Sequence, residues 1–69
     1  MTGRAEIRLA GRGGMFVADS CRIDGPWVHV EGRWRVRLAT GIGWGATGAY
    51  TWPVAAVAEV RWQIAAVTA

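Results

Sequence analysis

The chain has 69 residues, a formal net charge of +3 and a single cysteine, Cys21. A chain this short forms one domain, residues 1–69, which buries only about 60% of its unfolded surface. The lone cysteine excludes an internal disulfide, and a structural zinc site needs about four Cys or His ligands, whereas only Cys21 and His29 are present. We therefore expect no metal or cofactor, and expect stability to come from packing of the five tryptophans or from self-association.

The first two predicted strands cover residues 4–10 and 15–23. In the first, Ala5, Ile7 and Leu9 alternate with charged residues, which is the period-two pattern of a half-buried strand. In the second, the apolar residues change face near Asp19–Ser20, which predicts a β-bulge or a sharp bend. Glycine-rich turns at residues 11–14 and 24–26 follow these strands.

Residues 27–31 and 33–39 resemble the two strands of a hairpin around Glu31-Gly32. The apolar residues of both segments are expected on the inner face: Val28, Val30, Trp34, Val36 and Leu38. The outer face then carries Trp27, His29, Arg35 and Arg37, with Arg33 at the start of the same arginine row. The packing of the apolar neighbours is sufficient to place this row outside.

The rest of the chain is predicted to be a glycine-rich loop, a short helical turn and a last strand. Residues 40–51 form the loop, residues 53–57 a 3₁₀-like turn beginning at Pro53, and residues 58–64 a strand with alternating apolar residues. The alternative is a single helix over residues 53–67, which would leave Trp62 away from the apolar stripe.

These elements predict an all-β fold of five short strands with one 3₁₀ turn before the last strand. Together with the segment WPVAAVAEVRW, residues 52–62, this arrangement resembles an SH3-like small β-barrel. It is also similar to small uncharacterised proteins of actinobacteria and their phages, in line with the exclusive use of arginine as the basic residue. The resemblance is architectural, and this fold does not by itself determine a function.

The predicted core is dominated by aromatic and branched side chains. Its members are Ile7, Leu9, Phe16, Val28, Trp34, Val36, Leu38, Val60 and Trp62. Closure of a barrel would pair the first strand with the last and bring Glu6 and Arg8 opposite Glu59 and Arg61.

The glycine-rich segment 43–48 matches G-x-G-x-x-G, but the chain is too short for the βαβ unit that a dinucleotide site needs. Large aromatic residues on such a loop are instead typical of partner contacts. Trp44, Tyr50 and Trp52 are therefore the candidate residues for binding a partner. The apolar residues 65–67 are a further candidate for pairing between copies.

A second hypothesis concerns the predicted outer face around the arginine row. Arg33, Arg35 and Arg37 could bind phosphates while Trp27 stacks on a base, with His29 beside them. The alternative is a solvated sheet face in which Trp27 covers an arginine side chain.

The sequence contains no recognisable catalytic motif. His29 has Glu31 nearby, but neither Ser20 nor Cys21 has the surroundings of a nucleophile. We expect a non-enzymatic, cytoplasmic binding module for a protein or another copy of itself, with nucleic-acid binding as the alternative. A phage or plasmid accessory protein would suit this description. Because no stretch of about 18 apolar residues exists, no membrane span is expected.

Overall fold

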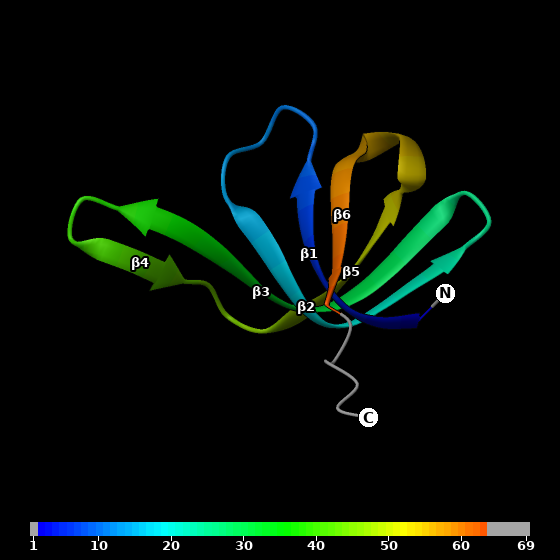
Figure 1. The fold of residues 1–69 in the computed structure, drawn as a ribbon, viewed down its shortest axis with the longest axis horizontal. Helices are drawn as coiled ribbons and strands as arrows, with labels where there is room; N and C mark the ends of the chain where they lie inside the picture. The colour runs from blue at the N-terminus through cyan, green and yellow to red at the C-terminus, as the bar shows by residue number, and fades with distance from the viewer. Residues whose placement is uncertain (1, 64–69) are drawn as a thin grey trace, which may run out of the picture.

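A computed structural model describes residues 2–63, and 76% of these residues belong to the strands of one antiparallel sheet (Figure 1). The sheet has six strands: β1 (Thr2–Leu9), β2 (Met15–Asp24), β3 (Trp27–Leu38), β4 (Gly41–Trp44), β5 (Gly48–Pro53) and β6 (Val57–Gln63). Their order is β4-β3-β2-β1-β6, with β5 also paired to β3. One 3₁₀ turn, η1 (Val54–Ala56), precedes β6. The all-β prediction and the 3₁₀ turn are thus confirmed, whereas the sheet has six strands and is not closed.

The predicted hairpin around Glu31-Gly32 is wrong, because β3 runs through both residues as one strand of 12 residues. The predicted inner and outer faces are nevertheless correct, since the even-numbered residues of β3 share the face that packs on the core. A side chain at Gly32 would overlap the carbonyl oxygen of Val17 and lie 2.8 Å from Cα of Ala18. Glycine therefore lets β3 bend tightly over β2 at the point where a turn was expected.

The prediction of a loop at residues 40–51 is also wrong over most of its length, because the segment contains β4 and most of β5. The two strands share one edge of β3: β5 pairs with its first half, from Trp27 to Gly32, and β4 with its second half, from Arg35 to Leu38. Glycine disfavours strands locally, but pairing with a long neighbouring strand overrides that preference.

The remaining local predictions are confirmed. The register between β2 and β3 shifts between Ala18 and Ser20, as expected for a bulge. Val57–Gln63 forms the strand β6, so a helix over residues 53–63 is excluded, while residues 64–67 lie outside the described part. The expected pairing of the first and last strands is present, with Glu6 opposite Arg61 and Arg8 opposite Glu59. No helix within residues 2–63 is long and apolar enough to cross a membrane.

The core lies on the concave face of the bent sheet, around Phe16. Its fully buried members are Ala5, Ile7, Phe16, Ala18, Cys21, Val28 and Val30, and Leu9, Ile23, Trp34, Trp52, Val57, Val60 and Trp62 pack against them. Phe16 makes edge-to-face contacts with Trp34 and Trp52, at centroid distances of 5.3 and 5.2 Å. Val36 and Leu38, predicted in the core, are exposed, because β3 leaves the body of the protein before it reaches them.

Candidate functional interface

The second half of β3 and the whole of β4 form a hairpin that projects from the rest of the sheet (Figure 1). We call this hairpin, residues 33–45, the arm. Its turn is tight, because Leu38 pairs with Gly41, and Gly41 has a positive φ of 135° that other residues rarely adopt. Among the described strands, β4 pairs with β3 alone, so its outer edge is unpaired. The opposite edge of the arm is paired with β2 only as far as Arg35.

The inner face of the arm consists of apolar side chains from β3 lying over glycines of β4. Val36 is opposite Gly43 and Leu38 is opposite Gly41. A Cβ on Gly43 would lie 2.8 Å from Cδ1 of Leu38, which shows that Leu38 leans across the bare β4 backbone. Half of the Leu38 surface nevertheless stays exposed, at 50%. The glycines of β4 leave this apolar face without a cover.

The outer face of the arm combines arginines of β3 with apolar residues of β4. Ile42 is opposite Arg37 and has an exposed fraction of 63%, higher than that of any other large apolar residue described. Trp44 is opposite Arg35, and the guanidinium of Arg33 lies 4.4 Å from the Trp44 ring centroid. This distance is in the range of a cation–π interaction. The outer face of the arm therefore exposes apolar surface next to arginine.

Ion pairing divides the arginines into two groups. Four arginines of the body lie within 4.0 Å of a carboxylate: Arg4 at Asp19, Arg8 at Glu59, Arg22 at Asp24 and Arg61 at Glu59. Arg35 lies 3.5 Å from Glu6, and this pair is the least exposed, with 33% and 14% of the side chains accessible. Within residues 2–63, Arg12, Arg33 and Arg37 have no carboxylate partner.

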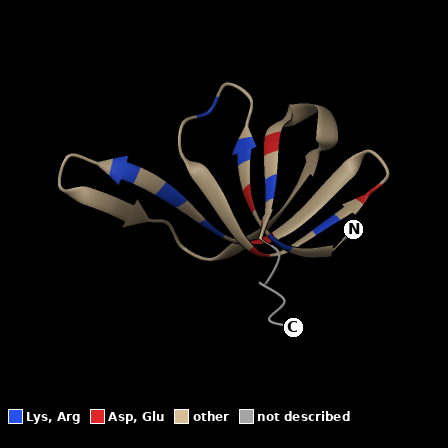
Figure 2. Cartoon of the chain, viewed as in Figure 1, with Lys and Arg blue, Asp and Glu red and all other residues tan. Residues whose placement is uncertain are grey.

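The three arginines without a carboxylate partner in the described range lie in the arm or beside it. Arg33 and Arg37 belong to the arm, which carries blue bands but no red band in Figure 2. Arg12 comes from the loop between β1 and β2, and its guanidinium lies 4.0 Å from the ring centroid of Trp34, at the base of the arm. The excess positive charge of the described chain is thus concentrated around the arm.

The three residues predicted to contact a partner are separated by the fold. Trp44 is 47% exposed and lies on the outer face of the arm. Trp52 is part of the core, and Tyr50 stacks on it at 5.7 Å with an interplanar angle of 14°. Both residues of β5 face Phe16, on the side of the sheet opposite to Trp44.

The residues of the nucleic-acid hypothesis also fall into two groups. Trp27 and His29 lie on the first half of β3, opposite Pro53 and Thr51 of β5. Arg33, Arg35 and Arg37 lie beyond the bend at Gly32, and Arg35 is neutralised by Glu6. The expected cover of an arginine of the row by Trp27 is wrong, since Trp27 and the three arginines follow one another on a single strand.

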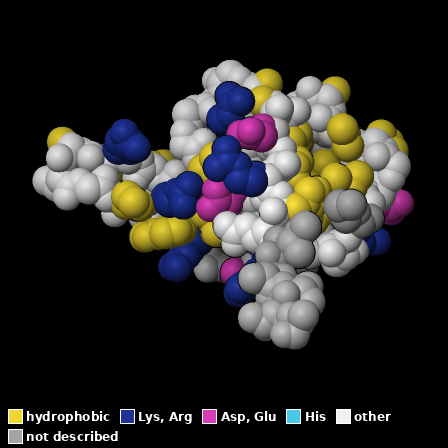
Figure 3. All heavy atoms as spheres, in the orientation of Figure 1, with side chains coloured by type: hydrophobic (Ala, Val, Ile, Leu, Met, Phe, Trp, Pro, Cys, Tyr) yellow, Lys and Arg dark blue, Asp and Glu magenta, His cyan; other side chains and the backbone are white. Residues whose placement is uncertain are grey.

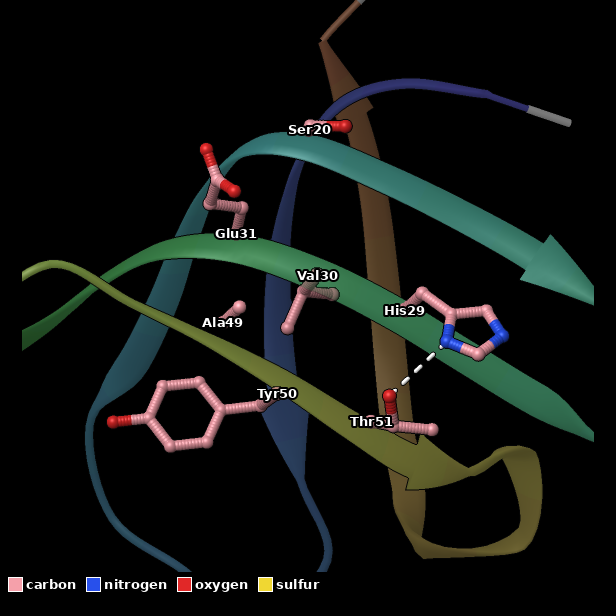
Figure 4. Close-up of a pocket in the computed structure, with 7 residues that line it drawn as sticks. All are labelled: Ser20, His29, Val30, Glu31, Ala49, Tyr50 and Thr51. Atoms are coloured by element: carbon pink, nitrogen blue, oxygen red, sulfur yellow. Dashed lines mark hydrogen bonds between the residues drawn. The ribbon is translucent and has the colours of Figure 1, made fainter.

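A shallow depression lies on the outer face beside His29 (Figure 4). Nδ1 of His29 and Oγ1 of Thr51 lie 3.0 Å apart and share a hydrogen bond. The Glu31 carboxylate points away from the imidazole ring, so the two do not form an acid–base pair (Figure 4). No group of three metal-ligating side chains occurs within the described range.

The sequence patterns did not identify Arg12 and Ile42 as residues of the candidate interface, and they assigned Leu38 to the core. A signal was present in Gly41-Ile42-Gly43-Trp44, where every second position of a strand lacks a side chain. Such a strand cannot cover the apolar side chains opposite it. That signal has meaning only once the pairing of β4 with β3 is known.

The comparisons with known proteins add no relative: no protein-family model, no curated protein and no solved structure matches the chain. The candidate interface therefore rests on the chemistry of the arm itself.

Proposed function

We propose that this chain is a non-enzymatic binding module that docks a protein partner through the arm. The observation that carries the proposal is the coincidence of two features on one projecting hairpin. Four of the large apolar residues with high exposure, Val36, Leu38, Ile42 and Trp44, lie on it. Two arginines without a carboxylate partner within residues 2–63 flank them, and Figure 3 displays apolar and basic side chains next to each other there.

The chemistry of the arm suits a protein better than a nucleic acid. Tryptophan and arginine, which both occur on the arm, are enriched among the energetic hot spots of protein interfaces. Reading a single strand requires free aromatic faces for the bases and several free cations for the phosphates. Arg33 already covers Trp44, and Arg12 covers Trp34. Arg35 is held by Glu6, which leaves a weaker phosphate site than the sequence suggested.

Nucleic-acid binding is the second candidate, supported by the clustering of Arg12, Arg33 and Arg37. Release of counterions from phosphates would make such binding fall steeply with salt. Docking of two arms on each other is disfavoured, because a symmetric contact would bring the unpaired arginines of both copies together.

The finer fold proposal is an SH3-like barrel that is partly open. Two hydrogen bonds of the 3₁₀ segment support it by tying the connection between β5 and β6 to other parts of the sheet. The Val54 N–H donates to the carbonyl oxygen of Pro26 at 2.7 Å, and the Ala10 N–H donates to that of Ala56 at 2.9 Å. These bonds hold the body around the core while leaving the arm outside it. A small accessory protein that binds to a larger protein would fit this arrangement of a packed body and a projecting arm.

The proposal is tested by selecting peptides from a displayed random library on the immobilised protein. We expect the selected peptides to lose about tenfold or more in affinity on the double variant Leu38→Ser with Ile42→Ser. The matched control is Val54→Ser, which removes an exposed apolar side chain outside the arm and should bind as the wild type does. Equal binding to the double variant would overturn the proposal.

A sizing column with light scattering, run with a short mixed DNA or RNA, tests the second candidate. We expect the mass to be unchanged by the oligonucleotide at low and at high salt. A shift in mass at low salt only, abolished by Arg33→Ala with Arg37→Ala, would instead establish nucleic-acid binding.

A further inference from the structure

The unpaired edge of β4 has backbone groups in position to accept another strand. The Gly45 N–H donates to the carbonyl oxygen of Trp34 at 2.9 Å, so residues 34 and 45 form a hydrogen-bonded pair. In an antiparallel ladder such pairs alternate with pairs whose N–H and C=O groups point away from the partner strand. Continuing the register, Gly43 and Gly41 bond to β3, while the backbone groups of Ile42 and Trp44 face the open edge.

Apart from its short length of 4 residues, the β4 edge lacks the usual protection against strand pairing. Proteins commonly shield exposed edges with charged residues, proline or a bulge. The β4 sequence, Gly41–Trp44, contains no charged residue and no proline, and its register with β3 is regular. The charges lie one strand further in, as Arg33 and Arg37 of β3, so they do not block an approaching backbone.

The two faces of the arm select different side chains for an added strand. On the inner face, an incoming side chain would lie beside the bare positions Gly41 and Gly43 and could reach Leu38 across them, which favours a large apolar residue. On the outer face, it would lie beside Ile42, with Arg37 directly behind. A carboxylate there meets a guanidinium that has no acidic partner within residues 2–63.

We propose, on the basis of the proposed function, that the β4 edge binds an extended segment of a protein partner in which apolar and acidic residues alternate. The segment adds a strand to the sheet, with backbone hydrogen bonds supplying affinity and the alternating side chains supplying specificity. A second copy of β4 does not fit this description, since it carries no carboxylate and brings the arginines of its own β3 into the same sheet.

The register gives a precise test with N-methylated peptides. The added strand runs antiparallel to β4, like the other neighbours in this sheet. Its residues opposite Ile42 and Trp44 then direct their N–H groups at β4 and their side chains to the outer face, so they are the acidic positions. A blocked peptide of alternating glutamate and valine should bind the full chain. Methylating the amide nitrogens of the glutamates should weaken binding about tenfold or more, whereas methylating those of the valines should leave it unchanged.

Charge recognition is tested with a peptide in which lysine replaces glutamate. We expect no binding to the wild type, and recovery of binding on Arg33→Glu with Arg37→Glu. Titrations followed by NMR to about 1 mM peptide detect even weak binding. The inference is overturned if the glutamate–valine peptide does not bind, if the lysine peptide binds equally well, or if the two methylated series behave alike.

These outcomes are distinct from a failure of the proposed function. Library peptides that lose affinity on Leu38→Ser with Ile42→Ser but tolerate every N-methylation would leave the arm as a protein-binding site and exclude strand addition. Library peptides that ignore the double variant would exclude both.

Discussion

The guanidinium of Arg35 on β3 donates a hydrogen bond to the carboxylate of Glu6 on β1, 3.5 Å away and across the width of β2. The same carboxylate oxygen accepts a bond from the Gln63 side-chain amide at 3.1 Å. This contact distinguishes Arg35 from the other two arginines of the row. Arg35 fastens the base of the arm to the body, whereas Arg33 and Arg37 have no acidic partner in the described chain.

The first prediction concerns this pair. Glu6→Gln removes the negative charge next to a guanidinium that is two-thirds buried, and we expect it to lower the free energy of unfolding by about 1 kcal/mol. Chemical denaturation measures the change. The matched control is Glu31→Gln, which removes a carboxylate without an ion pair among residues 2–63 and should change stability by less than about 0.5 kcal/mol. Equal effects of the two substitutions would show that the pair has no structural role.

The second prediction concerns the bend in β3. Gly32→Ala places a methyl group against the Val17 carbonyl and the Ala18 backbone, neither of which can move without breaking the β2–β3 ladder. We expect a loss of several kcal/mol, enough to unfold a domain of this size. Gly3→Ala is the control, since its Cβ would make an ordinary 3.7 Å contact with Trp62. Circular dichroism and thermal melts compare the two, and a folded Gly32→Ala protein with wild-type stability would contradict the close crossing.

The third prediction contrasts the core with the arm. Phe16 is fully buried and contacts three other aromatic rings, so Phe16→Ala should cost about 3–5 kcal/mol. Ile42 is mostly exposed, and Ile42→Ala should cost less than about 1 kcal/mol. Denaturant midpoints of the two variants provide the measurement. A large loss for Ile42→Ala would mean that the arm packs against the body, and its apolar face would then be structural.

The fourth prediction concerns pH. Burial raises the pKa of the Cys21 thiol, so the folded state holds the thiol proton more tightly than the unfolded state. This contribution to stability is complete below the ordinary thiol pKa of about 8.5 and declines as the pH rises through it toward the raised value. Relative to Cys21→Ala, the wild type should therefore lose stability with pH in the alkaline range, by at most about 1.4 kcal/mol per pH unit.

Unfolding curves of both proteins between about pH 7 and pH 10 test this expectation. A constant difference in unfolding free energy would contradict it. Because the Cys21 side chain is inaccessible, a thiol reagent should also react only as fast as the protein opens.

Patterns in the sequence predicted most of the local features of the chain. Alternation of apolar and polar residues identified the faces of β1, β3 and β6, and the change of phase near Asp19 located the bulge in β2. Proline at the start of η1 and the period-two pattern after it indicated a 3₁₀ turn followed by a strand. These signals are readable because side-chain periodicity and turn chemistry act over a few neighbouring residues.

Which strand faces are covered and which side-chain charges are paired depends on the tertiary structure. Alternation places Val36 and Leu38 on the same face as Val28, but it cannot tell that the strand facing them, β4, offers only glycines. The row of arginines looks uniform in the sequence, yet within residues 2–63 Glu6 pairs with Arg35 and no carboxylate pairs with Arg37, because pairing between distant strands brings only Arg35 near an acidic side chain. Burial and charge balance depend on such long-range pairings, so the arm became visible as a site only in the folded chain.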